Sequence, residues 1–365
     1  MTAPTMKLVA DYRDAYPDLA VEILEFFTDT NAHQHQTPAG HAGMRPRTVQ
    51  EFLDHMHKKQ VPPTSKPYPQ PEPINTICRR LVDLGWLSPA GQAAGTNIAG
   101  LNNAYIGILQ PGYDRYAINL HVSNAIYGWP CIYDTYYSSV VPILNEGTDG
   151  TLSIGTAFVV GPRTIVTAAH CILHARTVAL REVEPDLLQR ASVYVSSNTA
   201  IDLAVIQICE PILASHFPIS LGNGNVLDDV MVLGYPDVPG FHPTLAAEKA
   251  MISSRFTAIR GAVASAPEEI FARTSLFLIT ARVRGGFSGG PVLNSLGTCV
   301  GVVSREPASK SSGDQGGGHH LYDNLGYGTA IPTVLLKQIL EEVGSPNLTY
   351  ARRLEASEMT WTEFV

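Results

Sequence analysis

The chain has 365 residues, of which 45% are hydrophobic and 16% charged, with 31 glycines and 26 prolines. This is the composition of a globular protein with many turns. The length exceeds that of a usual single domain of roughly 100–200 residues, so we expect two domains. The formal net charge of −8 argues against polyanions as main partners, because non-specific affinity for nucleic acids depends on Lys and Arg. No charged segment followed by an apolar stretch opens the chain, and no run of about 18 apolar residues occurs, so we expect no secretory signal and no membrane span.

The cysteines are scattered along the chain and odd in number. They are Cys78, Cys131, Cys171, Cys209 and Cys299. They form no CxxC pair and show no Cys/His spacing typical of zinc sites, so the sequence predicts neither a disulfide framework nor a metal site. No cofactor is expected. A reducing cytosol fits this pattern best, and we expect a cytoplasmic protein.

Apolar residues recur at helical spacing in three early segments. These segments are residues 9–30, 47–59 and 73–87. In the second, Thr48 and Glu51 form a capping-box pattern at the helix start. In the third, Ile77, Leu81 and Leu84 share one face, and Gly85 is expected to end the helix. We therefore expect three helices.

Residues 95–109 follow as a predicted hairpin, because an apolar stretch comes after a Gly/Asn-rich turn region. Three helices and a hairpin resemble a winged-helix domain, which we place at residues 1–110. Acidic and basic residues about balance there, so nucleic acid is not the expected partner. An adaptor or regulatory domain that recruits a protein partner is favoured.

From about residue 115 the chain consists of short apolar runs separated by Gly, Pro, Asn and Asp, which is typical of an all-β sandwich or barrel. We assign residues 115–345 to this domain and residues 346–365 to a C-terminal tail. A last helix is expected within residues 331–344. Its apolar face is expected to carry Val334, Leu335, Ile339 and Leu340.

Three segments of the β domain carry the groups that amide hydrolysis requires: a nucleophile, a base, a group that orients the base, and donors to the oxyanion. The sequence TAAHC contains His170, the run IDLAVIQI contains Asp202, and the loop GGFSGGPV contains Ser288. Alone, each residue has an ordinary structural explanation. Together, in this order, they indicate a catalytic triad.

These motifs resemble those of trypsin-like peptidases of the chymotrypsin fold, most of all the HtrA-like branch, over roughly residues 130–345. The resemblance implies an all-β double β-barrel behind the mainly α domain. It also implies a serine endopeptidase in which Ser288 is the nucleophile, His170 the base and Asp202 the orienting acid. The expected partner is a protein or peptide substrate.

The same resemblance extends to the oxyanion donors, expected to be the backbone N–H groups of Gly286 and Ser288. Two departures from the digestive enzymes matter. Phe287 replaces the aspartate that pairs with a new N-terminus, so activation by clipping is not supported. Cys171 matches a disulfide-bonded cysteine of secreted relatives, but Ile154 lies where its partner is expected, so Cys171 should be a free, mostly buried thiol.

The substrate pocket is expected to involve Arg282, six residues before Ser288, where the family places the pocket base. An arginine there favours cleavage after Asp or Glu. The alternative is that Arg282 and Arg284 point to solvent. Two strands that resemble the pocket walls bring in three further residues. These are Ser304, Gly326 and Gly328.

The Ser/Gly-rich segment 305–325 between these pocket strands is expected to be mobile until a substrate or activator orders it. The alternative is a tolerated surface insertion. For the whole chain, the rival to an active enzyme is a catalytically silent, peptidase-like binding protein or a DNA-associated regulator. By analogy of architecture, the setting is bacterial defence, where small adaptor domains are coupled to trypsin-like peptidases.

Overall fold

The structure is a computed structural model. It describes residues 16, 18–28, 45–59, 69–108, 115–173, 175–181, 183–212, 216–236, 245–247, 252–270, 274–304, 327–355, 358 and 360–362. The chain divides into two compact units, Met1–Cys131 and Ile132–Val365. No helix in these described ranges is both long and apolar enough to cross a membrane.

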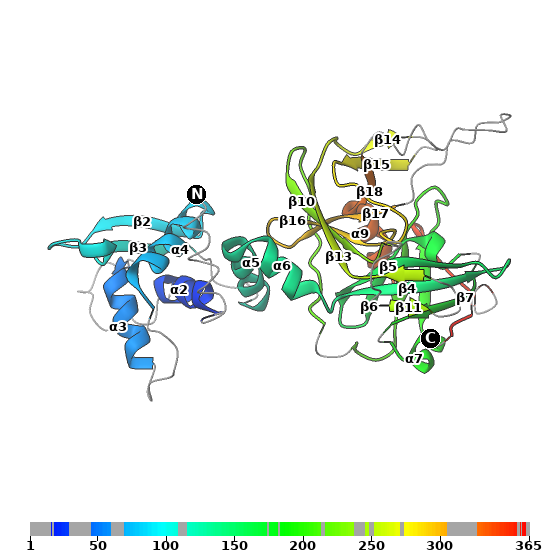
Figure 1. Cartoon of the computed structure of the whole chain (residues 1–365), viewed down its shortest axis with the longest axis horizontal. Coiled ribbons are helices and arrows are strands. Elements are labelled where there is room, and N and C mark those ends of the chain that lie inside the picture. Colours follow the sequence, from blue (N-terminus) through cyan, green and yellow to red (C-terminus); the bar gives the residue numbers. More distant parts are fainter. Residues whose placement is uncertain are drawn as a thin grey trace. The chain divides into compact units, whose positions relative to one another are not determined.

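The first unit is mainly helical and carries one small sheet (Figure 1). Its described helices are α2 (Leu19–Thr28), α3 (Val49–Lys59), α4 (Pro71–Asp83), α5 (Arg115–Tyr127) and the short 3₁₀ helix η2 (Ile98–Gly100). Its strands are β1 (Arg47–Thr48), β2 (Leu87–Gln92) and β3 (Asn103–Gly107), paired antiparallel in the order β1-β3-β2. Each of the three predicted helical segments contains a helix, and the hairpin is present with its first strand earlier than predicted.

The start of α3 contains the capping box that the sequence predicts. The Thr48 N–H donates to the Glu51 carboxylate over 2.7 Å, and the Glu51 N–H donates to the Thr48 hydroxyl over 3.1 Å. This reciprocal pair is the predicted capping box. In α4, Ile77 and Leu81 are buried as predicted. Leu84 is 40% exposed, because α4 ends at Asp83 and Gly85, at φ +75°, turns the chain away.

The second unit contains two seven-stranded antiparallel sheets. The first has the order β19-β8-β9-β6-β5-β4-β7, with β4 (Val140–Gly147), β5 (Leu152–Gly161), β6 (Thr164–Thr167), β7 (Ala175–Leu180), β8 (Ser192–Ser196), β9 (Ala204–Gln207) and β19 (Ala351–Arg353). Strands β5 and β6 bury Ala157, Val159 and Ile165 in the core that this sheet encloses.

The second sheet has the order β13-β10-β16-β17-β18-β15-β14. Its strands are β10 (Asp229–Gly234), β13 (Thr257–Ala262), β14 (Glu268–Ile270), β15 (Thr274–Ile279), β16 (Pro291–Asn294), β17 (Cys299–Val303) and β18 (Gly328–Pro332). A bridge between Val263 and Ile279 joins the end of β13 to β15, so this sheet curls back on itself. Two curled antiparallel sheets confirm the expected all-β double barrel.

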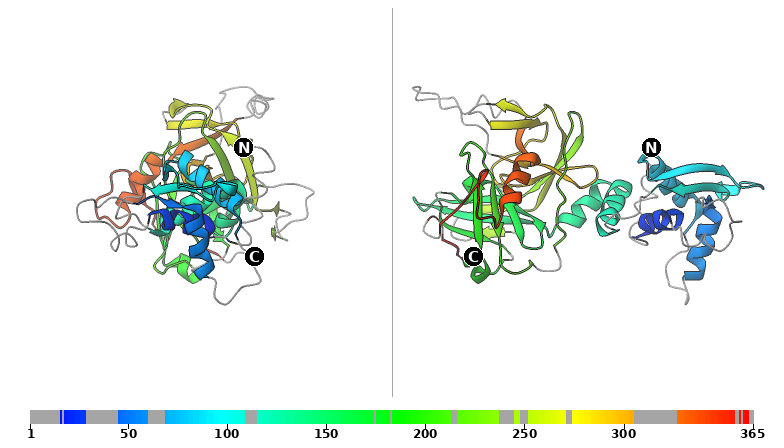
Figure 2. Two further views of the ribbon diagram at one scale, coloured as in Figure 1. Left: turned by 90° about the vertical axis from the view of Figure 1, so that its left-hand side faces the viewer. Right: turned by 180° about the vertical axis from the view of Figure 1, so that it is seen from behind.

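Smaller elements complete this unit. They are α6 (Trp129–Tyr136), which begins just before the division, the 3₁₀ helix η3 (Ala169–Cys171), α7 (Pro185–Gln189), α9 (Thr333–Glu342) and the paired strands β11 (Leu245–Ala247) and β12 (Ile252–Ser254). Helix α9, orange-red in the views from the side and from behind, packs against strands of both large sheets (Figure 2). It buries Leu336 and Ile339, whereas Val334, predicted on the apolar face, is 52% exposed.

Candidate active site

Strand pairing brings His170 and Asp202 together. Strands β6 and β9 are antiparallel, with Thr167 opposite Ala204, so the end of β6 lies beside the start of β9. His170 follows β6 in the single turn η3, and Asp202 lies two residues before β9. Residues 32 positions apart in the sequence therefore meet at one edge of the first sheet.

The Asp202 carboxylate is bonded through both oxygens. Oδ1 accepts the His170 backbone N–H over 2.9 Å, and Oδ2 lies 2.7 Å from the His170 Nδ1. Oδ2 also accepts the Ser304 hydroxyl over 3.1 Å. With the proton on Nδ1 directed at the carboxylate, the neutral imidazole keeps a free lone pair on Nε2. The pair thus holds His170 in the tautomer that can accept a proton.

The two side chains also change each other's proton affinity. Burial alone would lower the pKa of His170, but the hydrogen bond and charge of Asp202, together with neighbouring Cys171, raise that pKa above its ordinary value. Burial alone would raise the pKa of Asp202, but bonds from His170 and Ser304 lower it. The imidazole is 31% exposed, so a substrate can reach it.

Ser288 lies in a loop fastened to the rest of the unit by backbone bonds. Its carbonyl oxygen accepts the Thr156 N–H over 2.8 Å and lies 3.8 Å from the Sγ of Cys171, the residue after His170. The next residue, Gly289, donates its N–H to Val303, and buried Phe287 anchors the loop from inside. The loop therefore lies beside the turn that carries His170.

The segment before Ser288 forms a tight turn. The Phe287 N–H donates to the Arg284 carbonyl over 3.1 Å, and Gly286, in the third position, has φ +94° whereas φ of Gly285 is not positive. This is a type II turn, which requires glycine at that position. A Cβ on Gly286 would lie 2.3 Å from the Tyr235 oxygen. Both the conformation and the space therefore demand glycine.

The backbone N–H groups of this loop differ in what they bind. Those of Phe287, Gly289 and Gly290 donate to carbonyls of the loop or its neighbours. Those of Gly286 and Ser288, the predicted oxyanion donors, have no acceptor within the described part of the chain. Among the described residues, no hydrogen bond joins the Ser288 hydroxyl to His170. Catalytic hydrogen bonds are often long in enzymes without substrate and shorten when a substrate binds.

The predicted pocket residues differ in their exposure and in the groups that they contact. Arg282 follows β15 and is exposed. Ser304, the residue after β17, donates its hydroxyl to Asp202, so it contacts the proposed triad itself. Gly328 begins β18 and faces Val283, whose methyl group would lie 2.6 Å from an added Cβ. Gly326 and the predicted mobile segment 305–325 lie outside the described residues.

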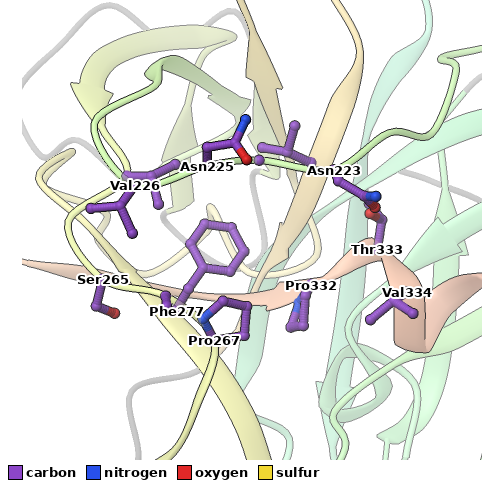
Figure 3. A pocket seen from close by; sticks show the side chains of 13 residues that line it. Asn223, Asn225, Val226, Ser265, Pro267, Phe277, Pro332, Thr333 and Val334 are labelled. Carbon is purple, nitrogen blue, oxygen red and sulfur yellow. The ribbon is translucent and has the colours of Figure 1, made fainter.

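A separate cavity of about 450 Å³ lies at one end of the second sheet (Figure 3). Its walls come from residues 223–226, Val263, residues 265–267 and the start of α9, and buried Phe277 and Val300 also line it. It contains none of the predicted site residues. The candidate active site is therefore the His170–Asp202 pair with the Ser288 loop, and not this cavity.

Sequence analysis missed two residues that support the loop. Thr156 donates its hydroxyl to the Gly286 carbonyl over 2.6 Å and accepts the Tyr235 N–H over 3.0 Å. Thr156 lies in the segment that leads to His170 and resembles the family there, but a buried hydroxyl that joins distant backbone segments leaves no local signal of its role in a sequence. Only the pairing of strands reveals it.

Comparisons with known proteins identify a peptidase domain in this chain. A family model described as "Trypsin-like peptidase domain" matches residues 155–302. The chain is 26% identical over 202 residues to Protease Do-like 2, chloroplastic, of Arabidopsis thaliana, covering 52% of this chain and 28% of that protein. It is 28% identical over 153 residues to Serine protease Rv3671c of Mycobacterium tuberculosis, covering 41% of this chain and 35% of that protein. The chain thus spans about a third of the length of these curated relatives.

Solved structures were also found to be similar. The active form of the Rv3671c protease from M. tuberculosis gives a TM-score of 0.43 at 20% identity, covering 60% of this chain and 86% of that one. The serine endoprotease from Yersinia pestis gives 0.38 at 20% identity, covering 58% and 65%. From the family model and the two curled sheets, we conclude that this chain contains a trypsin-like peptidase domain.

Proposed function

We propose that this protein is an active serine endopeptidase in which Ser288, His170 and Asp202 form the catalytic triad. The observation that carries the proposal is the Asp202 carboxylate, which holds the His170 ring through Nδ1 at 2.7 Å and its backbone at 2.9 Å. A structural histidine does not require both bonds. They serve a base whose tautomer and orientation must be fixed.

The proposed reaction has two halves. The Ser288 hydroxyl attacks the scissile carbonyl carbon while its proton passes to the His170 Nε2, and the carbonyl oxygen becomes an oxyanion bound by the N–H groups of Gly286 and Ser288. The C–N bond then breaks, and the leaving amine takes the proton from His170. Water repeats the attack on the acyl-enzyme, releases the acid and restores the Ser288 hydroxyl.

The proposed substrates are proteins or peptides. Arg282 is exposed, so its guanidinium is accessible to an acidic side chain, and we propose a preference for Asp or Glu before the cut. Ser304, Gly326 and Gly328 are proposed to flank the bound peptide. Ser304 has the additional contact to Asp202, so changes there would affect both binding and the triad.

The first unit is proposed to be a winged-helix-like regulatory or adaptor domain. Three helices followed by the β2–β3 hairpin support this. The two adjacent arginines of α4 are engaged within the unit: Arg79 donates to the Asn75 carbonyl over 3.3 Å, and Arg80 donates to the Ile126 carbonyl. This favours a protein partner over nucleic acid. A role in bacterial defence rests on architecture alone.

A reducing, cytoplasmic location is proposed from the thiols. None of the five cysteines forms a disulfide bond in the structure. Cys209 is exposed, and in an oxidising compartment an exposed thiol would be prone to pair with another molecule. Cys171 is buried beside the site.

A fluorophosphonate probe distinguishes an active enzyme from a silent binding protein. Wild-type protein should be labelled at Ser288, because the probe reacts with a serine activated by a neighbouring base. The Ser288→Ala variant should not be labelled. Ser295→Ala is the matched control, because Ser295 is the next serine along the chain and is exposed, and this variant should be labelled like the wild type. An unlabelled but folded wild-type protein would favour the silent alternative.

A further inference from the structure

Thr156 is fully buried in β5 and is bonded through all of its polar groups. Its N–H donates to the Ser288 carbonyl over 2.8 Å, and its hydroxyl donates to the Gly286 carbonyl over 2.6 Å. The same hydroxyl accepts the Tyr235 N–H over 3.0 Å, and the Thr156 carbonyl accepts the Thr167 hydroxyl over 2.7 Å. One side chain thus joins the nucleophile loop to the end of β10.

These bonds fix the direction of the proposed oxyanion donors. Each peptide group is planar, so holding the carbonyls of Gly286 and Ser288 fixes the two peptide planes on either side of the Ser288 N–H. The Gly286 N–H lies in the peptide plane between Gly285 and Gly286. Only the Cα of Gly286 separates that plane from the one that contains the Gly286 carbonyl. Thr156 therefore holds both donors through bonds to backbone carbonyls, without touching a substrate.

Tyr235 forms the opposite wall of the turn. A Cβ on Gly286 would lie 2.3 Å from its carbonyl oxygen, so the two backbones are in close contact. The Tyr235 hydroxyl donates to the Val140 carbonyl over 3.3 Å, and its ring centroid lies 5.5 Å from that of Phe256. The position of Tyr235 is therefore set by its side chain as well as by Thr156.

Phe256 connects this wall to helix α6. Its ring centroid lies 5.1 Å from that of Tyr133, which belongs to α6. It also lies 4.9 Å from that of Tyr137, just after α6, and this second pair is edge-to-face. Tyr133 and Tyr137 are themselves 6.3 Å apart. We call Tyr133, Tyr137, Tyr235 and Phe256 the aromatic cluster. It is a continuous set of ring contacts from α6 to the residue that borders Gly286.

We propose that Thr156 and the aromatic cluster are positioning elements for the oxyanion donors, so that the packing of α6 on Phe256 sets the catalytic rate. The proposal rests on the proposed function. Helix α6 is also where the chain passes from the first unit to the second, since Cys131 ends the first. A regulatory input that shifts α6 would reach the turn through this route without changing the triad.

The Thr156 arm of the test compares two variants. Thr156→Val keeps the shape but leaves the Tyr235 N–H and the Gly286 carbonyl without their shared partner, so kcat should fall roughly 10²–10³-fold, as when one oxyanion donor is lost. KM should stay within about twofold, because substrate contacts are unchanged. Thr156→Ser, which keeps the hydroxyl, should recover most of the rate.

The aromatic arm uses a matched pair of exposed tyrosines. Tyr137 is 50% exposed and contacts Phe256, whereas Tyr350 is 52% exposed and its ring is in no ring contact among the described residues. Tyr137→Ala should lower kcat several-fold with KM nearly unchanged, and Tyr350→Ala should leave both unchanged. The substrate is p-nitrophenyl acetate, and the end point of the reaction with a fluorophosphonate gives the concentration of active sites for every variant.

The outcomes separate the two proposals. Wild-type protein that neither hydrolyses the ester nor reacts with a fluorophosphonate at Ser288 would refute the proposed function itself. With an active wild type, equal kcat in Thr156→Val and wild type, or equal kcat in Tyr137→Ala and Tyr350→Ala, would overturn the positioning role. If Thr156→Val does not fold, the comparison of Tyr137→Ala with Tyr350→Ala decides, with melting temperature as the check on folding.

Discussion

The His170 imidazole must be neutral to accept a proton, so kcat/KM should rise with pH as His170 loses its proton. Because Asp202 raises the pKa of His170, the midpoint of that rise should lie above about 6.5, the ordinary histidine value. Asp202→Asn should shift the midpoint down and lower kcat, by about 10⁴-fold if it behaves like the corresponding change in trypsin. A profile flat from pH 5 to 8 would be incompatible with His170 as the base.

Arg282 is the residue on which the proposed cleavage preference depends. A peptide library that varies only the residue before the cut should be cleaved best after Asp or Glu, and Arg282→Gln should remove that preference. Arg284→Gln is the matched control, since Arg284 is also exposed and lies two residues away. Equal or better cleavage after Lys or Leu by the wild type would assign Arg282 to the solvent-facing alternative.

What could be predicted about single residues depended on motifs. His170 and Asp202 were identified because each lies in a recognisable segment, and the structure brings them within 2.7 Å. The contact of Ser304 with Asp202 and the bonds of Thr156 were not predicted. They join residues that are far apart in the sequence, and a hydroxyl in a strand has no pattern of its own.

The turn formed by residues 284–287 can be tested by substitution of its glycines. Gly286→Ala places a Cβ at φ +94° and 2.3 Å from the Tyr235 oxygen, so the turn must shift and kcat should fall roughly 10²–10³-fold. Gly285→Ala is the control, because a Cβ there meets nothing within 4 Å. Similar activities of the two variants would mean that the turn does not present the oxyanion donor.

Secondary structure was predicted best where a local signal exists. The capping box of Thr48 and Glu51 forms as expected, since its bonds depend only on nearby residues. The buried face of α9 was predicted only in part: Ile339 is buried as expected, but the sheets that α9 packs against also bury Leu336 and leave Val334 exposed. Helices α5 and α6 were not predicted at all, and α6 carries the aromatic Tyr133, whose partner Phe256 is distant in the sequence.

The two units of the whole molecule have separate cores. The residues of the proposed triad all belong to the second. A truncated protein beginning at residue 128, just before α6, should therefore still react with a fluorophosphonate at Ser288, whereas cleavage of its natural protein substrate should change. A folded truncated protein that never reacts would show that the first unit contributes to the site.

The central claim is that His170 and Ser288 act as one catalytic unit. It is tested most directly by the kcat/KM of fluorescein-labelled casein for wild type, Ser288→Ala, His170→Ala and the double variant. We predict that each single change abolishes nearly all turnover, on the order of the 10⁶-fold loss seen in subtilisin, and that the double variant is no worse than either. Substantial activity in both single variants, or losses that multiply in the double variant, would contradict the triad.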